Sequence, residues 1–203
     1  MRWWIRCRIS ITGLILIVVA TAAMSRFGLS HMPVPRITAG VAPYFTLLPA
    51  LVGTALVSIV DRGHHLAEAR SIRPVGVFML LGLHIVIAAT CAIWWFLLVR
   101  AWGEALTWQA IRSVIGYSGL ALIGYRGVGG RLGAAAPMLY AMAVATFGRD
   151  GGSLAWFPLL PADRIDAWIF VTLLWAVGIA ATVTRRAHLV RWERDAGSDT
   201  DRA

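Results

Sequence analysis

Few side chains in this sequence are arranged for catalysis. None of the five histidines belongs to an HExxH motif, in which two histidines bind zinc and a glutamate acts as the base. Residues 116–119 contain only a fragment of the GxSxG motif of serine hydrolases. No Walker phosphate-binding loop is present, so the chain cannot hydrolyse ATP by itself. We therefore expect no enzyme activity, no metal site and no cofactor.

Two ionisable side chains stand inside apolar segments and are candidate polar residues of a pathway. His84, within residues 75–99, could bind a substrate or carry a proton, and we favour the alternative of a hydrogen bond to a neighbouring helix. Arg112, within residues 106–125, is a functional candidate because charge inside a membrane is costly, or else its long side chain reaches the outer interface. No aspartate or glutamate lies inside the apolar segments, which argues against a proton-coupled antiporter.

The composition around these residues is that of a membrane protein. Of the 203 residues, 59% are hydrophobic and 14% are charged, whereas soluble domains carry about 25% charged residues. Ten tryptophans add to the signal, since tryptophan is enriched where membrane meets water. The net charge of +9 would suit a nucleic-acid binder, but the arginines follow a membrane topology, so we expect no nucleic-acid partner.

Six apolar segments predict helices that cross the bilayer, where about 20 residues are needed per span. In chain order they are residues 9–24, 41–60, 75–99, 106–125, 132–147 and 167–184. The first could instead be the apolar part of a cleaved signal peptide. The connections are too short for a soluble domain, so the expected fold class is an all-α, polytopic integral membrane bundle forming a single domain. Residues 185–203 follow as a basic and then polar tail.

The arginines indicate that both termini are cytoplasmic. All nineteen cationic residues are arginine. With the N-terminus inside, thirteen of them fall in cytoplasmic segments, five in external segments, and Arg112 within a span. This excess agrees with the positive-inside rule and with an even number of spans.

Two of the connections between the apolar segments have sequence patterns that can form structured elements. Residues 61–74 (DRGHHLAEARSIRP) mix both charges around apolar residues at helical spacing, which predicts a short amphipathic helix on the cytoplasmic face. Residues 148–168 begin and end polar but hold an apolar run from Leu154 to Leu160. This external run predicts either a short element that dips into the membrane or a plain loop anchored by Trp156 and Phe157.

The arrangement resembles the six-span permease subunits of type-2 ATP-binding-cassette exporters, which move drugs, lipids, polysaccharides and peptides. Residues 61–74 are similar to the family's pattern before the third span, namely an acidic residue and Arg, then Gly, then Leu-x-Glu, then Ser or Thr ahead of Pro. An apolar external element before the last span and a closing pair, Arg185 and Arg186, also match. The chain departs from the family in its short N-terminal segment.

The resemblance implies partners and site residues. In that family the loop after the second span contacts the ATP-binding subunit as a coupling helix, and this role falls here on Arg62, Gly63, Leu66, Glu68 and Pro74. The implied partners are a cytoplasmic ATP-binding subunit, a second permease copy or paralogue, and the lipid bilayer. The implied location is a bacterial plasma membrane. The alternative is a non-transporting membrane protein that acts in accessory, immunity or assembly roles.

Overall fold

The computed structural model describes residues 11–27, 31–33, 41–61, 75–128, 130–147 and 154–200. The α-helices of this part of the chain are α2 (Ile11–Phe27), α3 (Tyr44–Asp61), α5 (Val75–Trp102), α6 (Glu104–Val128), α7 (Gly130–Phe147) and α8 (Ile165–Thr200). The strands β1 (His31–Pro33) and β2 (Val41–Pro43) and the 3-10 helix η1 (Leu154–Leu159) complete the description. The fold is helical, as the composition predicted, and an α-helix covers each of the six predicted ranges almost entirely.

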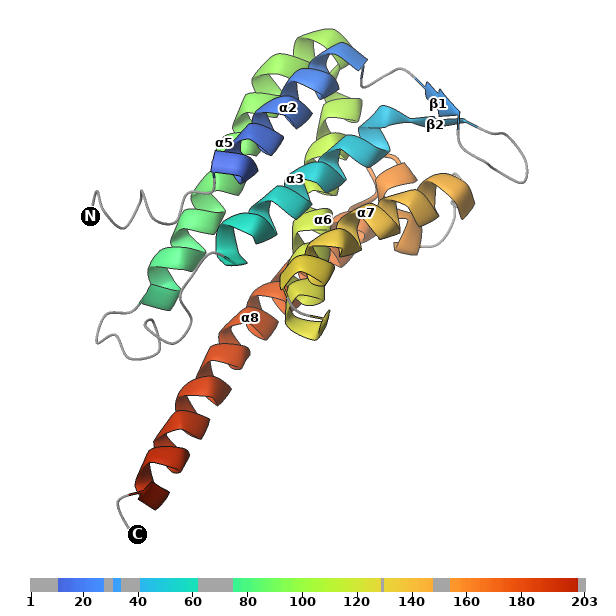
Figure 1. Ribbon diagram of the computed structural model, residues 1–203. Coiled ribbons are helices and arrows are strands. Elements are labelled where there is room, and N and C mark those ends of the chain that lie inside the picture. Colours follow the sequence, from blue (N-terminus) through green and yellow to red (C-terminus); the bar gives the residue numbers. More distant parts are fainter. Residues whose placement is uncertain are drawn as a thin grey trace.

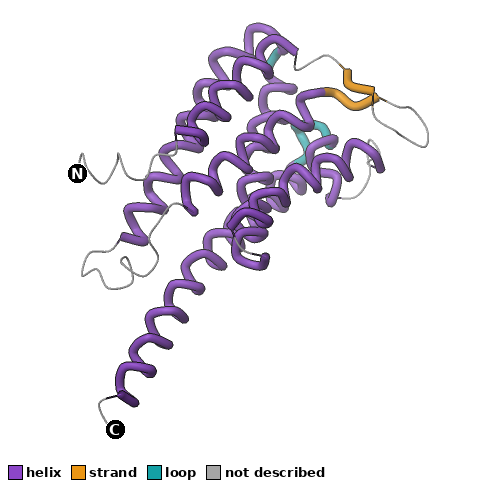
Figure 2. Tube along the Cα trace, in the orientation of Figure 1, coloured by secondary structure: helices purple, strands orange, loops and turns teal. Residues whose placement is uncertain are grey.

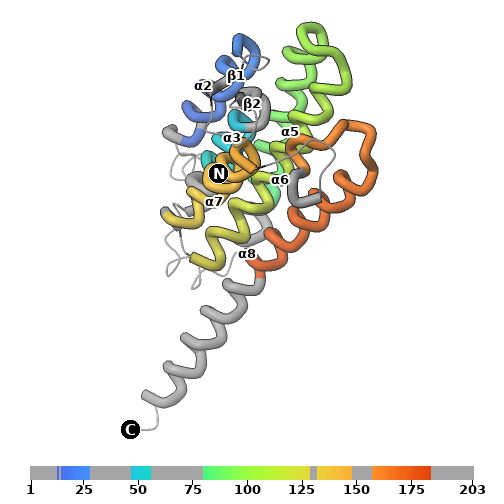
Figure 3. The backbone as a smooth tube through the Cα atoms, turned by 90° about the vertical axis from the view of Figure 1, so that its right-hand side faces the viewer, coloured from blue at the N-terminus to red at the C-terminus, as the bar shows by residue number. Residues whose placement is uncertain are grey.

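Helix α6 lies at the centre of the bundle. It packs against α8, α3, α7 and α5, and Figure 3 shows it between α3 and α7 on one side and α8 on the other. Several of its buried residues are polar, yet they cost little because their hydroxyls bond within the helix. Ser113 donates to the carbonyl of Gln109 at 2.8 Å, and Ser118 donates to that of Val114 at 2.7 Å. Neighbouring helices therefore shield the polar residues of α6.

Glycines set the distance between α6 and α8. A Cβ atom on Gly119 would lie 2.9 Å from the backbone of Leu174, and one on Gly178 would lie 2.9 Å from the Gly119 oxygen. Small residues at such crossings let two backbones approach closely, which is how helices associate in membranes. The two helices are therefore in backbone contact where these glycines meet.

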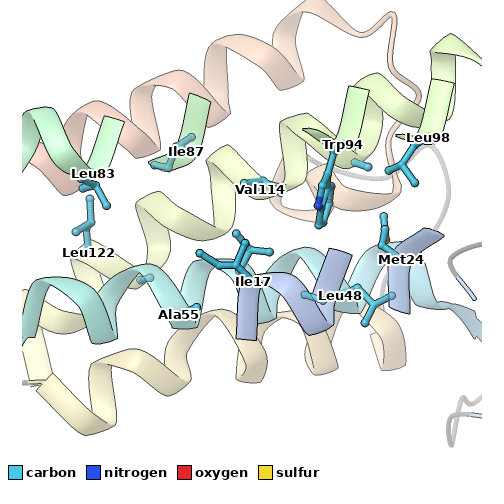
Figure 4. Packing of buried hydrophobic residues seen from close by; sticks show 14 of the residues in the cluster. Ile17, Met24, Leu48, Ala55, Leu83, Ile87, Trp94, Leu98, Val114 and Leu122 are labelled. Carbon is cyan, nitrogen blue, oxygen red and sulfur yellow. The ribbon is translucent and has the colours of Figure 1, made fainter. Parts of the chain in front are cut away.

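A hydrophobic core joins α2, α3, α5 and α6, as Figure 4 shows. Trp94 is fully buried, and its indole N–H donates to the Thr21 hydroxyl at 2.9 Å. Thr21 in turn donates to the Ile17 carbonyl at 2.8 Å. Met24, one turn further along α2, is also fully buried. Helix α2 is therefore an integral part of this packing.

The two strands, the α5–α6 turn and η1 lie at one end of the bundle (Figure 1). Consecutive helices alternate in direction, which brings the β hairpin, the α5–α6 turn and η1 to the same end (Figure 1). Gly103 makes the α5–α6 turn with a φ of 78°, in the left-handed region that favours glycine. Strands β1 and β2 pair antiparallel, with Met32 opposite Ala42 (Figure 2).

Two helices differ in extent from the predicted spans. The second apolar segment was expected to become helical at Val41, but Val41–Pro43 is a strand and α3 begins only at Tyr44. Proline disfavours helical backbone at the residue before it, so Pro43 sets this start. At the other end of the chain, α8 continues beyond the predicted span to Thr200, and it projects away from the other helices (Figures 1 and 2).

The outer surfaces of the bundle are apolar. On α8, Ile165, Ile169, Leu173 and Val177 recur every four residues and are each more than half exposed. Within the described residues, two helices are both long and apolar enough to cross a membrane, over Leu80–Trp102 and Ile165–Val183. The apolar helices over Ile15–Phe27 and Leu132–Phe147 are shorter. The six-span membrane bundle therefore stays a prediction.

Candidate functional site

Arg112 is buried and holds the external element in place. Its side chain has no exposed surface. Nη1 donates to the Pro161 carbonyl at 2.7 Å, and Nη2 donates to the carbonyls of Phe157, at 2.9 Å, and Leu160. These carbonyls lie at the end of η1 and just after it, and those of Phe157 and Pro161 also accept backbone hydrogen bonds, from the N–H groups of Leu160 and Arg164. The guanidinium therefore lies against η1, enclosed by the protein.

Gln109 extends the same clamp by one turn of α6. It lies three residues before Arg112, so both side chains leave the same face of the helix. Its Nε2 donates to the Pro158 carbonyl at 2.8 Å, and the residue is only 7% exposed. The sequence analysis missed Gln109. Its signal was the spacing of two polar residues on one face of an apolar segment.

Phe157 inserts η1 into the bundle. Its ring is fully buried and stacks on Tyr140 of α7, with centroids 5.7 Å apart and planes at 14°. Tyr117 of α6 lies 5.5 Å away, and Phe170 of α8 lies 6.2 Å away. A Cβ on Gly116 would lie 2.5 Å from the Phe157 ring, so only glycine leaves room for it. Between the predicted alternatives, the structure has a packed helical element in place of a plain loop.

Among the described residues, no acidic side chain is in direct contact with Arg112. Within the described residues, the ion pair at this end joins Arg164 and Asp166, both of which are partly exposed. Arg112 lies 6.0 Å from the ring centre of Trp168, a cation–π distance. Its Nε is buried without a hydrogen-bond partner. Carbonyl dipoles and the face of an aromatic ring therefore stabilise the buried charge. Through these contacts Arg112 anchors η1.

His84 stands apart from this clamp. Its imidazole is exposed, and Nδ1 lies 2.7 Å from the carbonyl of Leu80 on its own helix. Because a carbonyl can only accept, Nδ1 carries the proton in this bond. The ring meets Trp175 of α8 edge-on at 5.4 Å. The prediction that His84 forms a hydrogen bond to a neighbouring helix was therefore wrong, because the bond is to its own helix. The contact of His84 with α8 is between aromatic rings.

The expected coupling residues Arg62, Gly63, Leu66, Glu68 and Pro74 lie outside the described residues. The structure gives only the ends of their segment, since α3 ends at Asp61 and α5 begins at Val75. These ends lie at the end of the bundle opposite η1 (Figure 1). The clamp and the expected coupling segment therefore belong to opposite ends of the fold.

Comparison with known proteins finds no relative of this chain. No family model, no curated protein and no solved structure matches the chain. In the described part of the chain, no group of three or more His, Cys, Asp or Glu side chains is placed to hold a metal ion.

Proposed function

We propose that this chain is the membrane-spanning permease subunit of an ATP-driven exporter, working with a separate cytoplasmic ATP-binding subunit. The observation that carries the proposal is the external element η1, which lies between the fifth and sixth helices and folds back onto α6. A connection held by Arg112 and Gln109 has a defined position. This supports the resemblance to exporter permeases, in which an apolar external element precedes the last span.

The exposed surfaces support the membrane part of this proposal. Soluble monomers rarely expose large continuous apolar patches. Here α2, α5, α7 and α8 all carry exposed large apolar side chains, while the more polar α6 is enclosed by its neighbours. We place the six helices in a bacterial plasma membrane, with both termini in the cytoplasm.

The coupling part of the proposal concerns residues 62–74. They connect two helices at the end opposite η1, which is the cytoplasmic end in the proposed topology. A charged amphipathic segment at this place is suited to lie in a groove of an ATP-binding partner. We assign the contact to Arg62, Gly63, Leu66, Glu68 and Pro74, and place the substrate passage between two permease subunits.

A second candidate is a non-transporting accessory, immunity or assembly protein. One observation favours it: Arg112 is occupied by η1, and His84 bonds to its own helix, so neither is arranged around a passage through this chain. A permease with its passage between subunits would share this property. The two candidates therefore differ in their partners more than in their packing.

Purification in mild detergent from the native host tests the choice. We expect a nucleotide-binding subunit to copurify with the tagged chain and to be lost with Glu68→Arg. Glu104→Arg is the matched control, because it makes the same charge reversal at an exposed position at the η1 end of α6. Retention of the partner by Glu68→Arg would overturn the coupling assignment. A chain that purifies without any ATPase would favour the second candidate.

A further inference from the structure

Three tryptophans from three helices form a continuous aromatic group, here called the tryptophan row. Trp95 of α5 and Trp108 of α6 have ring centres 4.7 Å apart. Trp108 and Trp168 of α8 have ring centres 6.0 Å apart. Trp108, in the middle, is 43% exposed. The row therefore crosses the bundle at one level and is open to its surroundings.

Among the described residues, the exposed charged side chains nearest the row lie on its η1 side, where the exposed Phe96 and Ile165 also lie. Toward the η1 end, each helix has a charged and at least partly exposed residue just beyond its tryptophan: Arg100, Glu104 and Arg164. On the other side, exposed apolar residues follow, with Ile93 50% exposed on α5 and Ile169 56% exposed on α8. A boundary of this kind is where indole rings are enriched in membrane proteins.

The indole N–H groups are available on part of the row. Trp168 donates to the Ala162 carbonyl at 2.9 Å. Among the described residues, none accepts a hydrogen bond from the indole of Trp95 or Trp108. An indole prefers a site with an apolar body and a polar, hydrogen-bonding edge. The ester carbonyls of phospholipids offer such acceptors at the border of the hydrocarbon.

The distance from the row to the other end of the helices matches a bilayer. Along α6, the rise from Trp108 to the exposed Arg126 is about 27 Å. Along α8, the rise from Trp168 to Arg185 is about 26 Å, and along α5 the rise from Val75 to Trp95 is about 30 Å. The hydrocarbon core of a bilayer is about 30 Å thick. Three helices therefore give nearly the same span between the row and the opposite boundary.

We propose that the tryptophan row binds the glycerol and ester-carbonyl region of the outer phospholipid leaflet and fixes the depth of the bundle. Arg126 and Arg185 then mark the opposite leaflet. The proposal rests on the membrane placement in the proposed function and is independent of transport. A protein partner is less suited to the row, because exposed charged residues border it on the η1 side while exposed apolar residues continue on the other side, as at a lipid interface.

Lipid-depth quenching tests the row directly. Wild type, Trp108→Phe and Trp175→Phe are reconstituted in phosphatidylcholine vesicles with bromine near either the carbonyl or the methyl end of the acyl chains. The difference in emission between wild type and Trp108→Phe is the emission of Trp108. Bromine near the carbonyl end should quench it more than bromine near the methyl end. Trp175 lies about 10 Å further along α8 than Trp168, so its emission should be quenched more by the deep bromine. Trp108 emission that resists both bromines, whether or not aqueous acrylamide quenches it, would overturn the proposal.

A second measurement leaves the tryptophans intact. Nitroxide labels are placed at Ile165→Cys and Leu173→Cys, which are 74% and 59% exposed, after Cys7 and Cys91 are replaced by serine. We expect the first label to meet a water-soluble nickel chelate and the second to meet oxygen dissolved in the hydrocarbon. Equal exposure of both to the chelate contradicts the inference. Extraction of the protein by alkaline carbonate would overturn the membrane proposal itself, whereas an integral protein with an unquenched row defeats only the inference.

Discussion

At the scale of single residues, Arg112 supplies side-chain donors to the end of η1. Replacing it by methionine keeps a long unbranched side chain but removes these donors from the carbonyls of Phe157, Leu160 and Pro161. The carbonyls of Phe157 and Pro161 keep a backbone donor, whereas none is found for that of Leu160 among the described residues. Each buried polar group left unpaired costs about 1–3 kcal/mol. We expect Arg112→Met to unfold at a clearly lower denaturant concentration than wild type, as followed by circular dichroism in detergent.

Lysine at the same position separates charge from geometry. It keeps the positive charge but cannot reach several carbonyls with a planar fork, so Arg112→Lys should fall between wild type and Arg112→Met. Arg100→Met is the control, because Arg100 is exposed and has no such bonds among the described residues. Equal midpoints for Arg112→Met and Arg100→Met would show that the clamp contributes nothing to stability.

At the scale of elements, the α6–α8 crossing should tolerate no added atom. Gly119→Ala places a methyl group 2.9 Å from the backbone of Leu174, so the helices must separate. Gly82 of α5 has nothing within 4 Å of the same position. Gly82→Ala should therefore be neutral or gain up to about 1 kcal/mol from alanine's higher helix propensity. We expect opposite shifts of the two unfolding midpoints, and a stabilising Gly119→Ala would contradict the close approach.

The same scale shows what the sequence could and could not predict. Apolar runs predicted where helices would form, because apolar residues recur along the helix face that is buried or in contact with an apolar environment. The contacts of Arg112 and Gln109 could not be predicted, since their partners lie 45 or more residues away and depend on how η1 packs. Trp94 and Trp95 are adjacent in sequence, yet one is fully buried against Thr21 and the other joins the tryptophan row. Only the packing of α2 against α5 decides this difference.

At the scale of the whole molecule, the alternating helices and the arginine distribution lead to one topology. Helices that alternate in direction place the Gly103 turn and the start of α7 at opposite ends of the bundle (Figure 1). The positive-inside rule assigns the end with the greater number of arginines to the cytoplasm. Glu104 should therefore face outward, and Val128 should face the cytoplasm.

Cysteine labelling in intact spheroplasts checks this topology on the full chain. Both positions are exposed, Val128 by 66%, and each is replaced by cysteine after Cys7 and Cys91 become serine. A membrane-impermeant maleimide should label Glu104→Cys at once and Val128→Cys only after the membrane is opened. Labelling of both in intact spheroplasts would mean that α6 does not cross the membrane. Labelling of Val128→Cys alone would invert the bundle, place residues 62–74 outside, and remove the basis for an ATP-binding partner at that loop.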